Sequence, residues 1–141
     1  MRILWATLTA IVLVPLAGGF YLIMSPVWRD NARLNDLRER VLAHPLPPNT
    51  SGIYPKDPEA TFGKNLTGGS GDYCDYRVRL TLQTALSEEE IRTYFREAKI
   101  PGAVHQAQIS LFFEEEGDAG GRRVIVEVYD SHDSDWDWRC I

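Results

Sequence analysis

The longest run of apolar positions lies near the N-terminus, where residues 3–24 carry no charged side chain. A helix rises about 1.5 Å per residue, so this run spans about 33 Å and can cross a hydrocarbon core of roughly 30 Å. Trp5 lies near one end of the run, and Tyr21 and Trp28 lie near the other, where aromatic rings favour the membrane interface. The pattern predicts a transmembrane signal anchor over residues 1–25.

Two other structures are compatible with an apolar run of this kind, a cleaved signal peptide and a buried helix of a soluble protein. A signal peptide has an apolar region of about 7–15 residues followed by small residues at the cleavage site. The run here is longer, and the sequence 16–18, Leu-Ala-Gly, is a weak cleavage site. No cysteine follows the run as lipoprotein processing requires, so an uncleaved single-pass anchor is the preferred interpretation.

The segment after the anchor has a different pattern. Residues 27–43 alternate in charge and carry Leu34, Leu37 and Val41 at helical spacing, which predicts a short solvated helix. The pair Ser25-Pro26 is typical of an N-cap followed by the first helical position. Three prolines then enforce extended backbone up to Gly52. We therefore expect residues 26–52 to form a stalk helix and a proline-rich linker.

The rest of the chain, residues 53–141, has the pattern of one small folded module. Apolar and polar positions alternate most clearly over 73–84, which predicts a strand with one buried face. Ser87 followed by Glu90 forms a capping box that predicts a helix. Further strands are expected at residues 60–67, 107–115 and 122–130. The fold class is therefore α+β, with a mostly antiparallel sheet of about four strands and one packed helix.

The chain has two cysteines, Cys74 and Cys140. Cys74 falls on the apolar side of the alternating strand. Trp136, Trp138 and Cys140 share one parity, so an extended tail would place them together against the module, with Asp137 on the solvent side. We expect a disulfide with Cα atoms about 4.4–6.8 Å apart. Two unrelated reduced thiols are the alternative.

The side of the membrane on which the module lies is indicated by two opposing signals. The N-terminal flank offers only Arg2, whereas four arginines follow the anchor, and this count alone favours a cytoplasmic module. Disulfides persist outside the cytosol, so the expected cysteine pair favours the other side. We weigh the cysteines more heavily and expect an extracytoplasmic module.

The polar side of the alternating strand is one candidate ligand surface, formed by Tyr73, Asp75, Arg77 and Arg79. These side chains can bind a ligand if that face of the sheet is open. The alternative is a solvated face with cross-strand ion pairs. The glycine-rich segment 68–71 can likewise cradle an anion, but a tight turn explains it more simply.

The acidic tail is the densest set of potential metal ligands. Asp133, Asp135 and Asp137 have the two-residue spacing that begins a calcium-binding loop. Trp138 then stands where that loop needs glycine, and no closing glutamate follows. We therefore expect a solvated acidic tail, no metal site and no cofactor.

Charge and motifs narrow the function only in part. The chain has 15 Lys and Arg against 20 Asp and Glu, a net charge of −5, which argues against binding to nucleic acid. No Gly-x-Ser-x-Gly motif is present, and the three histidines lie in unremarkable positions. The leading hypothesis is a membrane-anchored envelope protein whose non-enzymatic module binds an envelope protein partner. The alternative is a membrane-tethered hydrolase, metal-assisted through the aspartate-rich tail.

Four segments together carry a resemblance to a known group of proteins. They are His-Pro-Leu-Pro-Pro at 44–48 with Thr50, Gly-Ser-Gly-Asp-Tyr-Cys-Asp-Tyr at 69–76, Leu-Gln-Thr at 82–84, and Leu-Ser-Glu-Glu-Glu-Ile at 86–91 with Tyr94 and Phe95. This set resembles small membrane-anchored or secreted bacterial proteins without an assigned activity. The resemblance implies a location in the bacterial envelope and supplies no catalytic residues.

Overall fold

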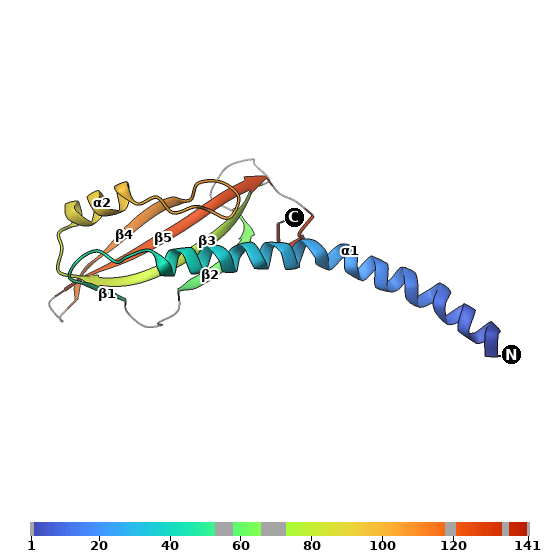
Figure 1. The fold of residues 1–141 in the computed structure, drawn as a ribbon. Coiled ribbons are helices and arrows are strands. Elements are labelled where there is room, and N and C mark those ends of the chain that lie inside the picture. The colour runs from blue at the N-terminus through green and yellow to red at the C-terminus, as the bar shows by residue number, and fades with distance from the viewer. Residues whose placement is uncertain (1, 53–57, 66–72, 118–120, 134–135, 141) are drawn as a thin grey trace.

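The structure is a computed structural model in which a long helix extends from one end of a small sheet domain (Figure 1). It describes residues 2–52, 58–65, 73–117, 121–133 and 136–140, and the backbone alone at 2–10 and 115–117. The predicted α+β class is confirmed, with an apolar N-terminal helix, an antiparallel sheet and one further α-helix.

The N-terminal helix α1 is one continuous element of 42 residues, Arg2–Ala43. Pro15 and Pro26 lie inside it, so the prediction that Ser25 and Pro26 begin a separate stalk helix is wrong. Each proline lacks an N–H and removes one helical hydrogen bond. The helix bends as it leaves the sheet domain (Figure 1), as helices that contain proline commonly do.

The five strands form one sheet in the order β1-β3-β5-β4, and β2 also pairs with β3. Their bounds are β1 Thr50–Gly52, β2 Glu59–Lys64, β3 Tyr73–Thr84, β4 Gln108–Gly117 and β5 Gly121–Asp133. All pairings are antiparallel. β3 pairs with β5 along its whole length, and its other edge is shared between β1 and β2.

The strand predictions are confirmed in kind and adjusted in extent. β3 has the predicted bounds, because its period-two pattern is unambiguous. β5 continues to Asp133 because its pairing with β3 runs on as far as Tyr73. β1 lies in what was predicted to be linker, and Thr50 reaches Thr84 through a hydroxyl hydrogen bond of 2.8 Å. The glycine-rich turn at 68–71 lies outside the described residues.

Helix α2, Glu88–Glu97, begins at the predicted capping box. The backbone N–H of Ser87 donates to the Glu90 carboxylate at 2.8 Å, and the Glu90 N–H donates back to the Ser87 hydroxyl at 3.4 Å. These reciprocal bonds satisfy two backbone donors that a helix start otherwise leaves unpaired. A short 3₁₀ helix, η1, Trp138–Cys140, ends the described chain.

Both α-helices pack on the same face of the sheet. The buried cluster joins side chains from α1, α2, the loop after α2 and the inward positions of β3 and β5, namely Leu37, Val41, Tyr76, Val78, Leu82, Ile91, Phe95, Ile100, Val124, Val126 and Val128. Leu34 packs against its edge. The second half of α1 is therefore a core element of the module, rather than the solvated stalk that its charges predicted.

The end of α1 is also tied to the loop that follows α2. The Arg40 guanidinium donates to the carbonyls of Pro101 and Gly102, each at 2.9 Å. On the side of the sheet, the buried Asp130 carboxylate of β5 accepts hydrogen bonds from the backbone N–H groups of Val104 at 2.6 Å and His105 at 2.8 Å. The loop is thus held between α1 and β5.

This packing yields a first prediction. Replacing Leu37 with alanine should lower the free energy of unfolding of the full chain in detergent by about 2–5 kcal/mol, because Leu37 has no exposed surface. Leu42 lies on the same helix but is exposed, so Leu42→Ala should change it by less than about 0.5 kcal/mol. Urea denaturation measures both. Equal small effects would contradict the placement of α1 in the core.

Candidate functional site

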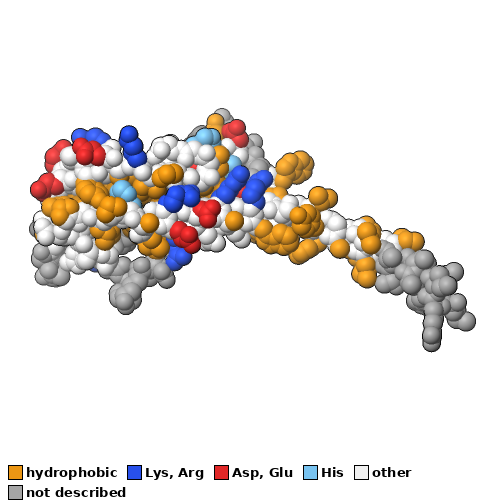
Figure 2. Space-filling view, in the orientation of Figure 1, with side chains coloured by type: hydrophobic (Ala, Val, Ile, Leu, Met, Phe, Trp, Pro, Cys, Tyr) orange, Lys and Arg blue, Asp and Glu red, His pale blue; other side chains and the backbone are white. Residues whose placement is uncertain are grey.

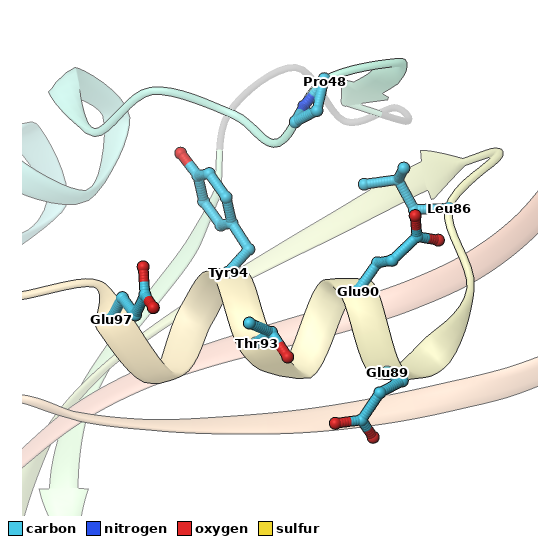
Figure 3. Close-up of a pocket in the computed structure, with 7 residues that line it drawn as sticks. All are labelled: Pro48, Leu86, Glu89, Glu90, Thr93, Tyr94 and Glu97. Atoms are coloured by element: carbon cyan, nitrogen blue, oxygen red, sulfur yellow. The ribbon is translucent and has the colours of Figure 1, made fainter.

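A groove between α2 and the proline-rich segment is the candidate functional site. It has a volume of about 400 Å³ and lies at the end of the module far from the N-terminus (Figures 1 and 3). Its lining consists of Pro48, Leu86, Glu89, Glu90, Thr93, Tyr94 and Glu97. Apolar and aromatic surface thus lies beside the Glu97 carboxylate, whereas Glu90 is bound to Ser87 and Glu89 points away towards Arg96 (Figure 3). This arrangement suits a segment that is apolar and carries a basic residue.

The walls of this groove are positioned by two local interactions. The Tyr94 hydroxyl donates to the Pro45 carbonyl at 2.6 Å, and the Tyr94 ring contacts His44 edge-on, so the proline-rich segment is held against α2. Glu90 is fixed by its capping role. Two hydrogen bonds from Ser87 hold the pKa of Glu90 below its ordinary value. The bond from the Ser87 side chain has the larger effect, and the bond from its backbone the smaller. The Glu90 carboxylate is therefore charged at neutral pH.

The predicted ligand surface lies on the other face of the sheet and is crossed by ion pairs. Arg77 pairs with Asp75 at 2.8 Å and approaches Glu127 at 3.7 Å, and Arg79 also pairs with Glu127. Asp75 is buried and accepts a second hydrogen bond, of 2.6 Å, from the Ser131 hydroxyl. Tyr73 remains exposed at the strand end. The acids and bases of this face are thus engaged with one another.

The tail differs from its prediction. Trp136 and Trp138 are exposed, and Asp137 is fully buried, because the chain turns into η1 instead of continuing as an extended strand. Asp133 ends β5, and Asp135 lies outside the described residues. Among the described residues no group of three or more His, Cys, Asp and Glu side chains is placed to hold a metal ion.

Asp137 has a structural partner in Arg139. The Arg139 guanidinium donates to the Asp137 carboxylate at 2.6 Å and 3.0 Å, and the Arg139 N–H adds a third bond at 3.0 Å. Burial on its own raises the pKa of Asp137, but the hydrogen bonds and charge of Arg139 outweigh burial, so the pKa lies below its ordinary value. Asp137 is therefore a charged clamp residue.

The same arginine attaches the tail to α1. Arg139 donates to the Asn31 side chain at 2.7 Å and to the Val27 carbonyl at 3.4 Å, and its guanidinium lies 4.7 Å from the centre of the Phe62 ring. One side chain thus joins η1, β2 and the long helix. The sequence offered no signal for this clamp, because Arg139 is 108 positions from Asn31.

Cys74 and Cys140 lie at disulfide distance, with Cα atoms 5.7 Å apart. The separation falls within the predicted window, although the tail reaches it by a 3₁₀ turn and not by an extended strand. Both cysteines are buried. The bond closes the tail onto the start of β3, next to the Arg139 clamp.

Asp30 is a second buried carboxylate that sequence reasoning missed. It has no exposed surface and accepts a 2.8 Å hydrogen bond from the Tyr76 hydroxyl. Arg29 at 3.1 Å and Arg33 at 3.5 Å supply positive charge from the same helix. Burial, and then the bond to Asp30, raise the pKa of Tyr76 far above its usual range, so Tyr76 stays a neutral donor.

Comparison with known proteins finds no matching family model, no similar curated protein and no similar solved structure.

The cysteine pair supports a second prediction. Cys140→Ser should lower the free energy of unfolding by about 2–5 kcal/mol, because the unfolded chain regains the freedom of a long loop. The double variant Cys74→Ser with Cys140→Ser should lose no more than the single variant, since the bond is already absent. Oxidised wild type should run faster than reduced protein on a denaturing gel. Identical mobility with and without reductant would contradict the disulfide.

The clamp supports a third prediction, on acid stability. Because the pKa of Asp137 is lowered by folding, its contribution is fully present above the unfolded value of about 3.9 and disappears as pH falls through the native value. Asp137→Asn should therefore cost about 1–3 kcal/mol at neutral pH and progressively less towards about pH 2. Urea titrations at several pH values measure the difference.

The matched control for this experiment is Asp133→Asn, which removes the charge of an exposed aspartate close in sequence. It should change the free energy of unfolding by less than about 0.5 kcal/mol at every pH. A constant cost for Asp137→Asn from neutral to acid pH would show that its carboxylate charge has no part in the clamp.

Proposed function

We propose that this chain is a single-pass membrane protein of the bacterial envelope, whose extracytoplasmic module is a non-enzymatic interaction domain held rigidly by its own anchor. The observation that carries the proposal is the contrast along α1. From Ile11 onward its apolar stretch is exposed on all sides, with Ile11 at 70% and Leu22 at 73%, whereas Leu37 and Val41 are buried in the module.

An exposed apolar helix of this length is stable in hydrocarbon. The described part of α1 has a mean hydropathy of 1.8 in its most apolar window and is long enough to span a membrane. Only 6% of that window is buried, which argues against a core helix of a soluble protein. A helix that is hydrophobic all round and unburied by protein needs lipid around it.

The extracytoplasmic side is supported by the cysteine pair, because a buried disulfide persists in an oxidising compartment. The interaction role is supported by the groove beside α2. It lies at the end of the module far from the N-terminus (Figure 1), and Glu97 on its rim complements a basic partner segment (Figure 3). The acids nearer the membrane, Asp30 and Asp137, are occupied in holding the fold together.

Membrane insertion and topology are tested in bacterial cells that express the full chain. We expect the protein to stay in the membrane pellet after alkaline extraction, and protease added to spheroplasts to degrade the module. Leu13→Arg with Val14→Arg should release it, since each arginine costs about 2.5–3.5 kcal/mol in the hydrocarbon centre. The control variant Leu42→Arg, whose substitution lies at an exposed position beyond the span, should stay in the membrane pellet. Full protection from protease would place the module in the cytoplasm.

The groove is tested by photo-crosslinking in the same cells. A photoreactive residue at Thr93, which lines the groove, should give a discrete crosslinked product with an envelope protein. The same residue at Thr81, on the opposite face of the sheet, should not. Charge reversal at Glu97 should reduce crosslinking from Thr93 by about tenfold, as loss of a close charge pair does. Equal crosslinking from both positions would contradict the groove as the partner site.

A further inference from the structure

Three exposed tryptophans form a surface that the proposed function does not use. Trp136 is 88% exposed, Trp138 is 63% exposed and Trp28 is 48% exposed. Tryptophan seldom remains this exposed on a water-facing surface unless it belongs to an interface, because the ring offers a large apolar area and one polar N–H. We refer to Trp28, Trp136 and Trp138 as the tryptophan surface.

The Arg139 clamp brings the tail that carries Trp136 and Trp138 to the turn of α1 that carries Trp28. Arg139, next to Trp138, donates to the Val27 carbonyl, and Val27 is the neighbour of Trp28. The Cys74–Cys140 pair closes the tail from the other side. The C-terminal end therefore lies beside α1 where the helix leaves the module (Figure 1), and hydrophobic side chains gather there (Figure 2).

The tryptophan surface continues directly from the apolar part of α1. The Trp28 ring contacts Phe20 and Tyr21 edge-on, with ring centres 6.4 Å and 6.0 Å apart. Arg29 and Arg33, whose side chains are 46% and 37% exposed, lie on the following turn. Tryptophan and tyrosine rings favour the headgroup level of a bilayer, and arginine binds phosphate well.

We propose that the tryptophan surface is a second membrane contact, in which Trp136 and Trp138 enter the headgroup region of the phospholipid bilayer that α1 spans. The inference rests on the proposed membrane anchor. The occupant is the lipid interface because the surface adjoins the point where the exposed apolar helix ends. The contact fixes how the module stands on the membrane, since two attachment points restrict the tilt that one helix leaves open.

The test uses the intrinsic fluorescence of the full chain in phospholipid vesicles. Trp5→Phe with Trp28→Phe leaves Trp136 and Trp138 as the only tryptophans. Vesicles made with lipid brominated high on the acyl chain should quench their emission by roughly half, as expected for rings at headgroup level. Lipid brominated near the methyl end should quench them much less. Retention of the disulfide on a non-reducing gel reports that the variant is folded.

Two further chains control the experiment. A chain that retains only Trp28 reports the anchor itself and should be quenched. A chain without native tryptophans but with Phe112→Trp carries an exposed ring on the opposite face of the sheet and should not be quenched.

Each outcome is decisive for one of the two proposals. Quenching of Trp136 and Trp138, with Phe112→Trp unaffected, supports the second contact. Quenching of Trp28 alone overturns the second contact and leaves the anchor standing. No quenching of Trp28 overturns the anchor. Tryptophans shielded both from brominated lipid and from an aqueous quencher would show that protein covers the surface instead of lipid, which also overturns the second contact.

Discussion

A single buried hydrogen bond sets the position of the long helix on the sheet. Asp30 has no exposed surface, and a carboxylate in that position is tolerated only when it is paired. The Tyr76 hydroxyl, from the middle of the sheet, donates to it at 2.8 Å. Since burial keeps Tyr76 neutral, this donor is present at every ordinary pH. Rotation or sliding of α1 would separate Asp30 from the Tyr76 hydroxyl and leave it only Arg29 and Arg33 of its own helix, so the bond favours one position of the helix.

The other features of the molecule follow from that position of α1 on the sheet. It turns Leu37 and Val41 towards the core, and it brings Val27 and Asn31 within reach of Arg139. The clamp and the disulfide then close the tail against the same helix. A long helix that is also a core element transmits its orientation to the sheet, and a flexible stalk cannot do this. The groove beside α2 is consequently held at a defined distance from the apolar part of α1.

The sequence predicted those features that depend on neighbouring residues. It did not predict those that depend on contacts between residues far apart in the chain. Strand β3 and the capping box at Ser87 were predictable because each depends on residues only a few positions apart. The burial of Asp30 was not, because its donor lies 46 positions away. The prediction for the tail was wrong for a different reason. Residues of the same parity share a face only in an extended chain, and residues 138–140 are helical. The groove joins two segments that the sequence keeps apart.

Backbone hydrogen exchange in lipid nanodiscs tests the continuity of α1 most directly. The central claim is that the helix runs unbroken from the membrane into the core across Ser25 and Pro26. We predict slow exchange for amides throughout residues 27–38, with protection as strong as that of β3. A flexible joint at this position, as in a free stalk, would give exchange close to the unprotected rate over residues 25–33 while β3 stays protected. That result would contradict a rigid anchor.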